Sequence, residues 1–325
     1  MSGSVCHMTK EQRRQWTADR IPDLDGRVFV VTGANGGLGL ATVRALVRRG
    51  GHVILAVRDV EKGRRAAMDA TAGRRPGGVR PEVRRLDLAD PDSVRAFADG
   101  VRADHDRLDV LVNNAGVMAV PRSLTPYGHE SQFACNHLGH FALTGLLLDL
   151  LAAGRDPRVV TVSSVNHRKA GLGLDFDDLA DERRYSPMGA YNRSKFANAV
   201  FGCELHRRLT EAGSPVRSLL AHPGYTATGL QMKSSSAAQR LLLGRVGNAL
   251  LAQAPERGAL PQLYAATEPG LAGGLFIGPS GKGELRGAPT EVELAPAAAD
   301  PATGRRLWEL SEEATGVRYA FPAPV

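Results

Sequence analysis

The chain has 325 residues, of which 43% are hydrophobic, so it can bury the core of one large domain or two small ones. The formal net charge of +7 comes largely from Arg residues scattered along the sequence, and aromatic residues make up only 5%. Because a nucleic-acid site needs clustered basic residues with aromatics between them, we expect no nucleic-acid partner.

Residues 1–24 are predicted to be an N-terminal extension, because the start of the chain is polar and shows no periodic pattern. It lacks the apolar segment of a signal peptide, and the longest apolar run, 141–153, is interrupted by Asp149 and is too short to span a bilayer. The three cysteines have no metal-ligand spacing and fit a reducing compartment. We therefore expect no transmembrane segment and a cytoplasmic location.

From residue 27 onward, apolar strand-like runs alternate with helical patterns. Strands are predicted at 27–32, 52–57, 82–88, 108–114, 158–164, 216–224 and 273–279, and helices at 38–49, 60–72, 93–102, 136–152, 191–210 and 304–317. Strands that are apolar on both faces and alternate with helices indicate a parallel sheet covered on both sides. The fold class is therefore α/β, a doubly wound (Rossmann) single domain over residues 25–285 with seven mostly parallel strands. Residues 286–325 are predicted to pack on the same domain.

The stretch "VTGANGGLGL" joins the first predicted strand to the first helix. Its glycines, Gly33, Gly37 and Gly39, let the backbone approach a pyrophosphate closely, and the amides that open the helix at Leu38 attract the anion together with the helix dipole. At the first strand–helix junction of an α/β fold, such a loop predicts a dinucleotide site. The predicted phosphate-binding residues are Gly33, Asn35, Gly36, Gly37, Leu38 and Gly39.

The spacing of this loop, TGxxxGxG, resembles that of the short-chain dehydrogenase/reductase family. The other motifs of that family follow in order as "NNAG" at 113–116, Tyr191-x3-Lys195, Asp87-Leu88 after the third strand, and "HPG" at 222–224. The stretches "CNHLGHF", "SSVNH", "FDDL" and "AYNRSKFAN" are similar to the retinol dehydrogenase-like branch, whose members also have a long segment between the catalytic serine and tyrosine. The resemblance covers about residues 25–285.

The resemblance implies that a dinucleotide lies between the glycine loop and the turn Asn114, Ala115 and Gly116, with Asp87 and Leu88 at the adenine. Val57 occupies the place of the acid that binds the ribose of NAD, and the next residue, Arg58, can pair with a 2′-phosphate, so the expected cofactor is NADP(H) rather than NAD. Asp59 is expected to cap the next helix. The resemblance also places Pro223, Gly224, Thr226 and Thr228 at the cofactor.

The catalytic residues implied by the family are Asn136, Ser164, Tyr191 and Lys195, of which Tyr191 and Lys195 also bind the cofactor. Tyr191 and Lys195 are four apart and face one side of a helix. A nearby ammonium and an oxidised nicotinamide are expected to lower the tyrosine pKa toward neutrality, so that Tyr191 serves as general acid and base. Ser164 would bind the substrate oxygen, with Ser163 as its rival, and Asn136 would hold a water leading from Lys195 to solvent.

The predicted function is hydride transfer between NADP(H) and a carbonyl or alcohol. The segment 225–258 is interpreted as a flap with apolar residues, which suits a lipophilic small-molecule substrate. Two alternatives stay open, reduction of an activated C=C bond and a non-catalytic NADP-binding regulatory protein.

No metal is expected, because no acid or cysteine completes a set with His137 and His140. The family resemblance allows a homodimer or homotetramer.

Overall fold

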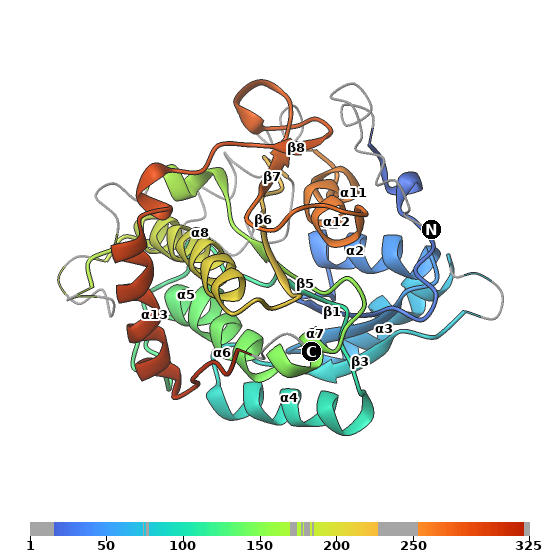
Figure 1. Cartoon of the computed structure of the whole chain (residues 1–325), viewed down its shortest axis with the longest axis horizontal. Helices are drawn as coiled ribbons and strands as arrows, with labels where there is room; N and C mark the ends of the chain where they lie inside the picture. Colours follow the sequence, from blue (N-terminus) through green and yellow to red (C-terminus); the bar gives the residue numbers. More distant parts are fainter. Residues whose placement is uncertain are drawn as a thin grey trace.

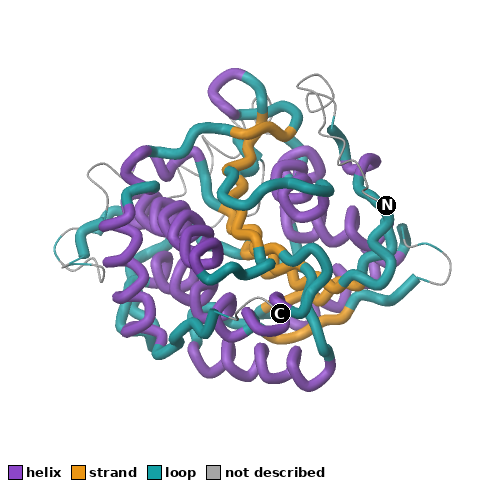
Figure 2. The backbone as a smooth tube through the Cα atoms, viewed as in Figure 1, coloured by secondary structure: helices purple, strands orange, loops and turns teal. Residues whose placement is uncertain are grey.

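One sheet of eight strands, in the order β3-β2-β1-β4-β5-β6-β7-β8, runs through this computed structural model, which describes residues 16–73, 75, 78–169, 174–176, 178, 183, 185–226 and 253–321 (Figure 2). The first seven strands are parallel, and β8 is antiparallel to β7. The strand bounds are β1 Val28–Thr32, β2 His52–Val57, β3 Glu82–Arg85, β4 Val110–Asn113, β5 Arg158–Val162, β6 Arg217–Ala221, β7 Phe276–Pro279 and β8 Pro289–Glu291. The strand order reverses between β1 and β4, which opens a crevice outside their carboxyl ends.

Alternate residues of the central strands face two separate cores, as Phe29 and Val31 of β1 face one and Val30 the other. Helices α2, α3 and α12 cover the first face, and α4, α6 and α8 the second (Figure 1). The helix bounds are α2 Gly37–Arg48, α3 Val60–Thr71, α4 Pro91–Asp104, α5 Ser131–Phe133, α6 Gly139–Leu146, α7 Leu148–Ala152, α8 Pro187–Glu211, α11 Pro255–Gly258, α12 Leu260–Thr267 and α13 Pro301–Thr315. Short helical turns are η1 Ala18–Arg20, η2 Ala134–Leu138, η3 Val165–Lys169, η6 Lys282–Glu284 and η7 Pro296–Ala298. The predicted doubly wound α/β fold is thus confirmed.

The predicted count of seven strands is wrong, because residues 289–291 form an eighth. This strand has only three residues and starts at Pro289, which lacks an N–H, so its sequence carries no strand periodicity. An antiparallel edge position tolerates such a proline, and the strand pairs Pro289 with Pro279 of β7. The predicted third strand is also shorter than expected and ends at Arg85.

The C-terminal helix α13 lies along the outer side of α8 and α6 (Figure 1). Its Trp308 is 2% exposed and packs edge-on against Phe141 and parallel to Phe201, with ring centroids 5.0 and 6.0 Å away. The guanidinium carbon of Arg208 lies 4.4 Å from the centroid of the Trp308 ring. The chain's own C-terminal helix therefore occupies the outer face of α6 and α8.

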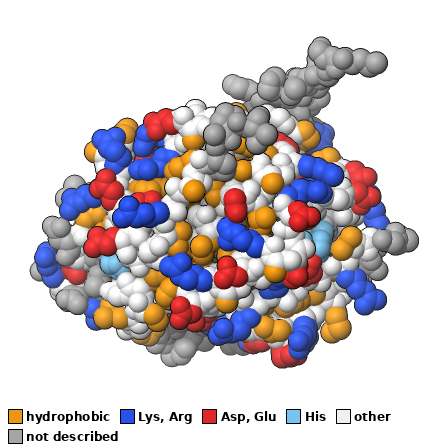
Figure 3. All heavy atoms as spheres, turned by 60° about the horizontal axis from the view of Figure 1, so that its bottom comes forward, with side chains coloured by type: hydrophobic (Ala, Val, Ile, Leu, Met, Phe, Trp, Pro, Cys, Tyr) orange, Lys and Arg blue, Asp and Glu red, His pale blue; other side chains and the backbone are white. Residues whose placement is uncertain are grey.

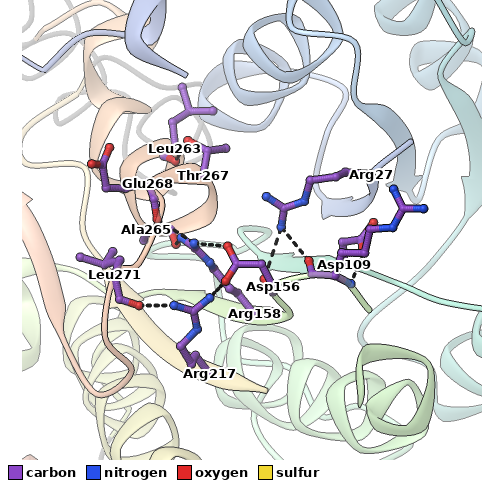
Figure 4. Close-up of polar contacts among 11 residues, drawn as sticks. Arg27, Asp109, Asp156, Arg158, Arg217, Leu263, Ala265, Thr267, Glu268 and Leu271 are labelled. Atoms are coloured by element: carbon purple, nitrogen blue, oxygen red, sulfur yellow. Dashed lines mark hydrogen bonds and ion pairs between the residues drawn. The ribbon is translucent and has the colours of Figure 1, made fainter. Parts of the chain in front are cut away.

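Arg158 is the first residue of β5, is fully buried, and lies at the centre of a cluster of polar contacts (Figure 4). Its guanidinium donates to the main-chain carbonyls of Ala265 (3.0 Å) and Glu268 (2.7 Å) and forms an ion pair with Asp156. Arg217 binds the same carboxylate. This cluster joins β5 and β6 to the end of α12.

Basic and acidic side chains are interspersed on the face drawn in Figure 3, so the positive charge is not gathered in one patch there. None of the described helices is both long and apolar enough to cross a membrane.

Candidate active site

The glycine loop leaves β1 at Thr32 and enters α2 at Gly37. Gly33 and Gly37 have φ values of +65° and +51°, in the left-handed region that favours glycine. No side chain caps α2, and its first turn contains no acidic residue. Gly36 is exposed, and Asn35 and Leu38 are half-buried. The first amides of α2 therefore remain available to an anion.

A buried hydrogen-bond network joins this loop to the turn after β4. The Thr32 hydroxyl accepts from the amides of Asn114 and Ala115, both at 2.9 Å, and the Asn114 side chain donates to the Thr32 carbonyl at 2.7 Å. Gln262 of α12 donates to the Asn114 side-chain oxygen at 3.2 Å. The two loops that flank the crevice are thus held in one arrangement.

His140 extends the network toward α6, and the sequence reveals no such role. Its Nε2 lies 2.9 Å from the Thr32 hydroxyl oxygen, and its Nδ1 lies 2.9 Å from the Asn136 carbonyl oxygen. Because that hydroxyl already accepts from two amides, a neutral ring that accepts from it at Nε2 and donates from Nδ1 to the Asn136 carbonyl satisfies both contacts. Burial lowers the pKa of His140 to about 4, which agrees with a neutral ring. The one feature of the sequence that could have indicated this role of His140 is its position on an otherwise apolar helix.

Asn136 lies in a π-helical turn, η2, which takes the place of the first residues of the helix predicted over 136–152, and that helix is divided at Leu147, between α6 and α7. Its side chain is fully buried, accepts from the Val117 amide at 2.8 Å, and donates to the Val117 carbonyl and the Ser194 hydroxyl, both at 2.9 Å. A Cβ added to Gly116 would lie 3.2 Å from the Asn136 side-chain oxygen and 3.6 Å from the Lys195 Nζ. The absence of a side chain at Gly116 thus lets these two residues approach the turn after β4.

Tyr191 and Lys195 lie one turn apart near the start of α8, and both are buried. The Lys195 Nζ is 5.9 Å from the centroid of the Tyr191 ring and donates to the Val162 carbonyl at 2.9 Å. The two serines after β5 have different neighbours. Ser164 lies beside the Tyr191 side chain and lowers its pKa, whereas the Ser163 hydroxyl donates to the Lys195 carbonyl at 2.7 Å and is buried. Ser164 is thus the serine placed beside the tyrosine.

In the protein without bound cofactor, burial has the largest effect on the pKa values of Tyr191 and Lys195. It raises the pKa of Tyr191 to about 12, against a smaller opposing effect of the hydrogen bond with Ser164, and lowers the pKa of Lys195 to about 8. This upward shift of the Tyr191 pKa is opposite to the downward shift expected for a tyrosine beside an ammonium and an oxidised nicotinamide. At neutral pH the protein alone therefore presents a phenol with its proton in place and a largely protonated Lys195.

The side chains predicted at the adenosine half of the cofactor lie at the ends of β2 and β3. Arg58 is exposed and forms no hydrogen bond or ion pair with any other described residue. Asp59 caps α3 as predicted, accepting from the Lys62 amide at 3.0 Å. Asp87 is half-buried and accepts from the Ala89 amide at 3.1 Å, and Leu88 is buried.

After β6, Gly224 has a φ of +65°, and a Cβ there would lie 2.4 Å from the Leu285 carbonyl oxygen. The Thr226 hydroxyl donates to the Pro223 carbonyl at 3.0 Å, and the side chain of Gln253 donates to the same oxygen at 2.6 Å. Thr228 and most of the predicted flap lie outside the described residues. A further contact fixes this turn, since His222 lies 2.9 Å from the Glu284 carboxylate.

Comparison with known proteins shows which family the chain belongs to. Residues 27–176 match the family model described as short chain dehydrogenase. Human retinol dehydrogenase 12 is 40% identical over 297 residues, which cover 91% of this chain and 88% of the relative. The chain belongs to the short-chain dehydrogenase family. Within it, the chain is retinol dehydrogenase-like.

Two further relatives agree with this membership. Human retinol dehydrogenase 13 is 41% identical over 300 residues, covering 90% of this chain and 86% of the relative. The crystal structure of an uncharacterized protein from Mycobacterium paratuberculosis superposes with a TM-score of 0.76 at 45% identity, covering 94% of this chain and 99% of that one. As a member of this family, the chain is an oxidoreductase that acts on alcohols or carbonyls.

Proposed function

We propose that this oxidoreductase uses NADP(H) and interconverts a carbonyl and an alcohol of a lipophilic small molecule, with Tyr191 as general acid and base. The observation that carries the proposal is the cluster in which Ser164 lies beside the Tyr191 side chain and Lys195 lies one helical turn away. When bound, the nicotinamide supplies or accepts the hydride. Tyr191 gives its proton to the substrate oxygen in reduction and removes it in oxidation, and Ser164 binds that oxygen.

The glycine loop fits a dinucleotide by its shape. A Cβ at Gly33 would lie 3.0 Å from Ala115 and one at Gly39 would lie 2.3 Å from the Gly33 carbonyl oxygen, so only glycine lets the loop pack this closely beside the uncapped start of α2. Asn114, Ala115 and Gly116 would line the other side of the crevice.

Two glycines of the loop provide a matched test of the cofactor site. A Cβ at Gly39 would lie 2.3 Å from the Gly33 carbonyl oxygen and 2.8 Å from the Asn114 Nδ2, whereas a Cβ at Gly36 would meet nothing within 4 Å. Gly39→Ala should therefore displace the loop, lower the free energy of unfolding by about 1–3 kcal/mol, and raise the Kd for NADPH at least about tenfold. Gly36→Ala should change that Kd less than about tenfold. Fluorescence titration with NADPH checks both, and equal Kd values for the two variants would contradict a cradle shaped by Gly39.

The choice of NADP(H) rests on Val57 and Arg58. Val57, at the end of β2, is apolar and 1% exposed, so it offers no acceptor to the ribose hydroxyls. The adjacent Arg58 guanidinium is exposed and unpaired among the described residues, and a 2′-phosphate would be its ion-pair partner.

Arg58→Ala should raise the Kd for NADPH roughly 10- to 100-fold, as expected for losing a hydrogen-bonded charge pair, and leave the Kd for NADH nearly unchanged. Isothermal titration with both cofactors measures the ratio. Arg64→Ala is the matched control, because Arg64 is an exposed arginine of α3 that pairs with Glu61. Equal weakening toward NADPH and NADH would rule out a 2′-phosphate contact.

The pH dependence of carbonyl reduction should report the ionisation of Lys195. Below a pH of about 8 the Lys195 ammonium is charged and favours transfer of the Tyr191 proton to the substrate. Above that pH the ammonium loses its charge, and this electrostatic effect disappears. Reductive kcat/KM should therefore be level near pH 7 and fall as the pH rises through about 8. In Lys195→Met the activity should be low and this alkaline fall should disappear. A fall that persists in Lys195→Met would assign the titration to another group.

The substrate class is proposed from the relatives, two of which are named for retinol, an apolar alcohol. NADPH consumption should be measured with a panel of aldehydes and ketones, including retinal and short polar members, with NADH in parallel. Higher kcat/KM for apolar carbonyls with NADPH is the expected result. Activity limited to polar carbonyls, or to NADH, would overturn the corresponding half of the proposal.

A further inference from the structure

Two imidazoles and a carboxylate meet at the amino end of the sheet, whereas the glycine loop follows the carboxyl end of β1. His52 is the first residue of β2, Glu82 the first residue of β3, and His105 the C-cap of α4. The Glu82 Oε1 lies 2.7 Å from the His52 Nε2 and 3.2 Å from the His105 Nε2. Among the described residues, this is the one group of three or more His, Cys, Asp or Glu side chains whose ligand atoms all lie within 4.8 Å of one another.

The Nε2 atom of each imidazole lies within ion-pair distance of Glu82 but forms no hydrogen bond with a described residue. The Nε2 atoms of His52 and His105 are buried, and within the described chain neither makes a hydrogen bond of acceptable geometry, although the carboxylate is close. A buried polar atom without a partner is costly, so a histidine pair in this state calls for a shared partner.

The carboxylate is already oriented by a second contact. Arg84 donates to the other oxygen of Glu82, Oε2, at 2.6 and 3.1 Å, which leaves Oε1 facing the two imidazoles. Arg84 also pairs with Asp104 at 2.8 Å, so the two acids together outweigh the one guanidinium. Outer contacts of this kind fix the ligands of metal sites.

We propose that His52, Glu82 and His105 bind one divalent transition-metal ion of the zinc class through the two Nε2 atoms and Oε1. Two imidazoles and one carboxylate suit Zn²⁺, Co²⁺ or Ni²⁺ rather than Mg²⁺ or Ca²⁺. Ligand atoms bonded to Zn²⁺ in a tetrahedron lie roughly 3.3 Å apart, which is close to the 2.7 and 3.2 Å from the Glu82 Oε1 to the two Nε2 atoms. The ion would tie together β2, β3 and α4, and a water would complete its coordination. The site is independent of the proposed oxidoreductase chemistry.

The test uses the full chain without an affinity tag, stripped of metal by a chelator. Titration with Zn²⁺ should give one site with a Kd on the order of micromolar, and saturating Zn²⁺ should raise Tm by about 2–5 °C. Co²⁺ should give the visible absorption bands of a low-coordinate nitrogen and oxygen site. His52→Ala and His105→Ala should each weaken this binding more than about tenfold and abolish the rise in Tm.

His206→Ala is the control, because His206 is a half-buried histidine on α8 outside the cluster. It should retain the Zn²⁺ site and the Tm rise. Melting each variant without metal shows whether it is folded, and Glu82→Gln provides a third ligand variant that keeps the side-chain size. Absence of stoichiometric binding in the unaltered chain would overturn the proposal. So would binding that survives in both His52→Ala and His105→Ala, since the ion would then sit elsewhere.

Discussion

Replacing Tyr191 with Phe should lower kcat for carbonyl reduction on the order of 10²- to 10⁴-fold, because it removes the proton donor and leaves the ring in place. The Kd for NADPH should change little, since the loops at the crevice are held by Thr32, Asn114 and His140 rather than by the Tyr191 hydroxyl. Single-turnover oxidation of NADPH with the best carbonyl of the panel measures the first quantity, and fluorescence titration measures the second.

Tyr127→Phe is the matched control for this experiment. Tyr127 is also buried, at 6% exposure, but its hydroxyl has no hydrogen-bond partner among the described residues. Its removal should leave kcat nearly unchanged. If Tyr191→Phe kept a tenth or more of the activity, Tyr191 would not be the acid. If that variant lost NADPH binding as well, its hydroxyl would have a structural role.

Arg158→Met should lower the free energy of unfolding by roughly 3–5 kcal/mol, as expected when one partner of a buried ion pair is removed. The guanidinium satisfies the Ala265 and Glu268 carbonyls near the end of α12, and Met would leave these acceptors without a donor (Figure 4). Urea denaturation followed by circular dichroism gives the free energy from the midpoint and slope.

Arg155→Met is the matched control, because it makes the same chemical change at an exposed position in the loop that leads into β5. Its cost should be within about 0.5 kcal/mol. A similar loss in both variants would mean that charge in this region, rather than the buried contacts of Arg158, is what stabilises the fold.

The fold class and the family could be predicted because their signals are local. A parallel strand buried on both faces is a short apolar run, and the stretches 28–32, 52–57 and 158–162 each show one. The eighth strand could not be predicted, because three residues beginning with a proline carry no period. The π turn at the start of the helix predicted over 136–152 could not be predicted for a related reason, since such a turn has no distinct residue pattern.

The catalytic and cofactor roles stay predictions, but the structure narrows the alternatives. It separates Ser164, beside Tyr191, from Ser163, which is bonded to the main chain of α8. The side chain of Asn136 already forms hydrogen bonds with Val117 and Ser194. A water on the path from Lys195 to solvent would therefore have to donate to a remaining lone pair on a carbonyl oxygen of Asn136.

The order of the elements, the glycine loop and the four-residue spacing of Tyr191 and Lys195 can be read from the amino-acid sequence without a structure, because each depends on residues close together in the chain. The rise in the Tyr191 pKa, the link from Thr32 through His140 to Asn136, and the meeting of His52, Glu82 and His105 become visible only in the folded chain. Burial and hydrogen bonding depend on which distant segments become neighbours, and no local spacing encodes that.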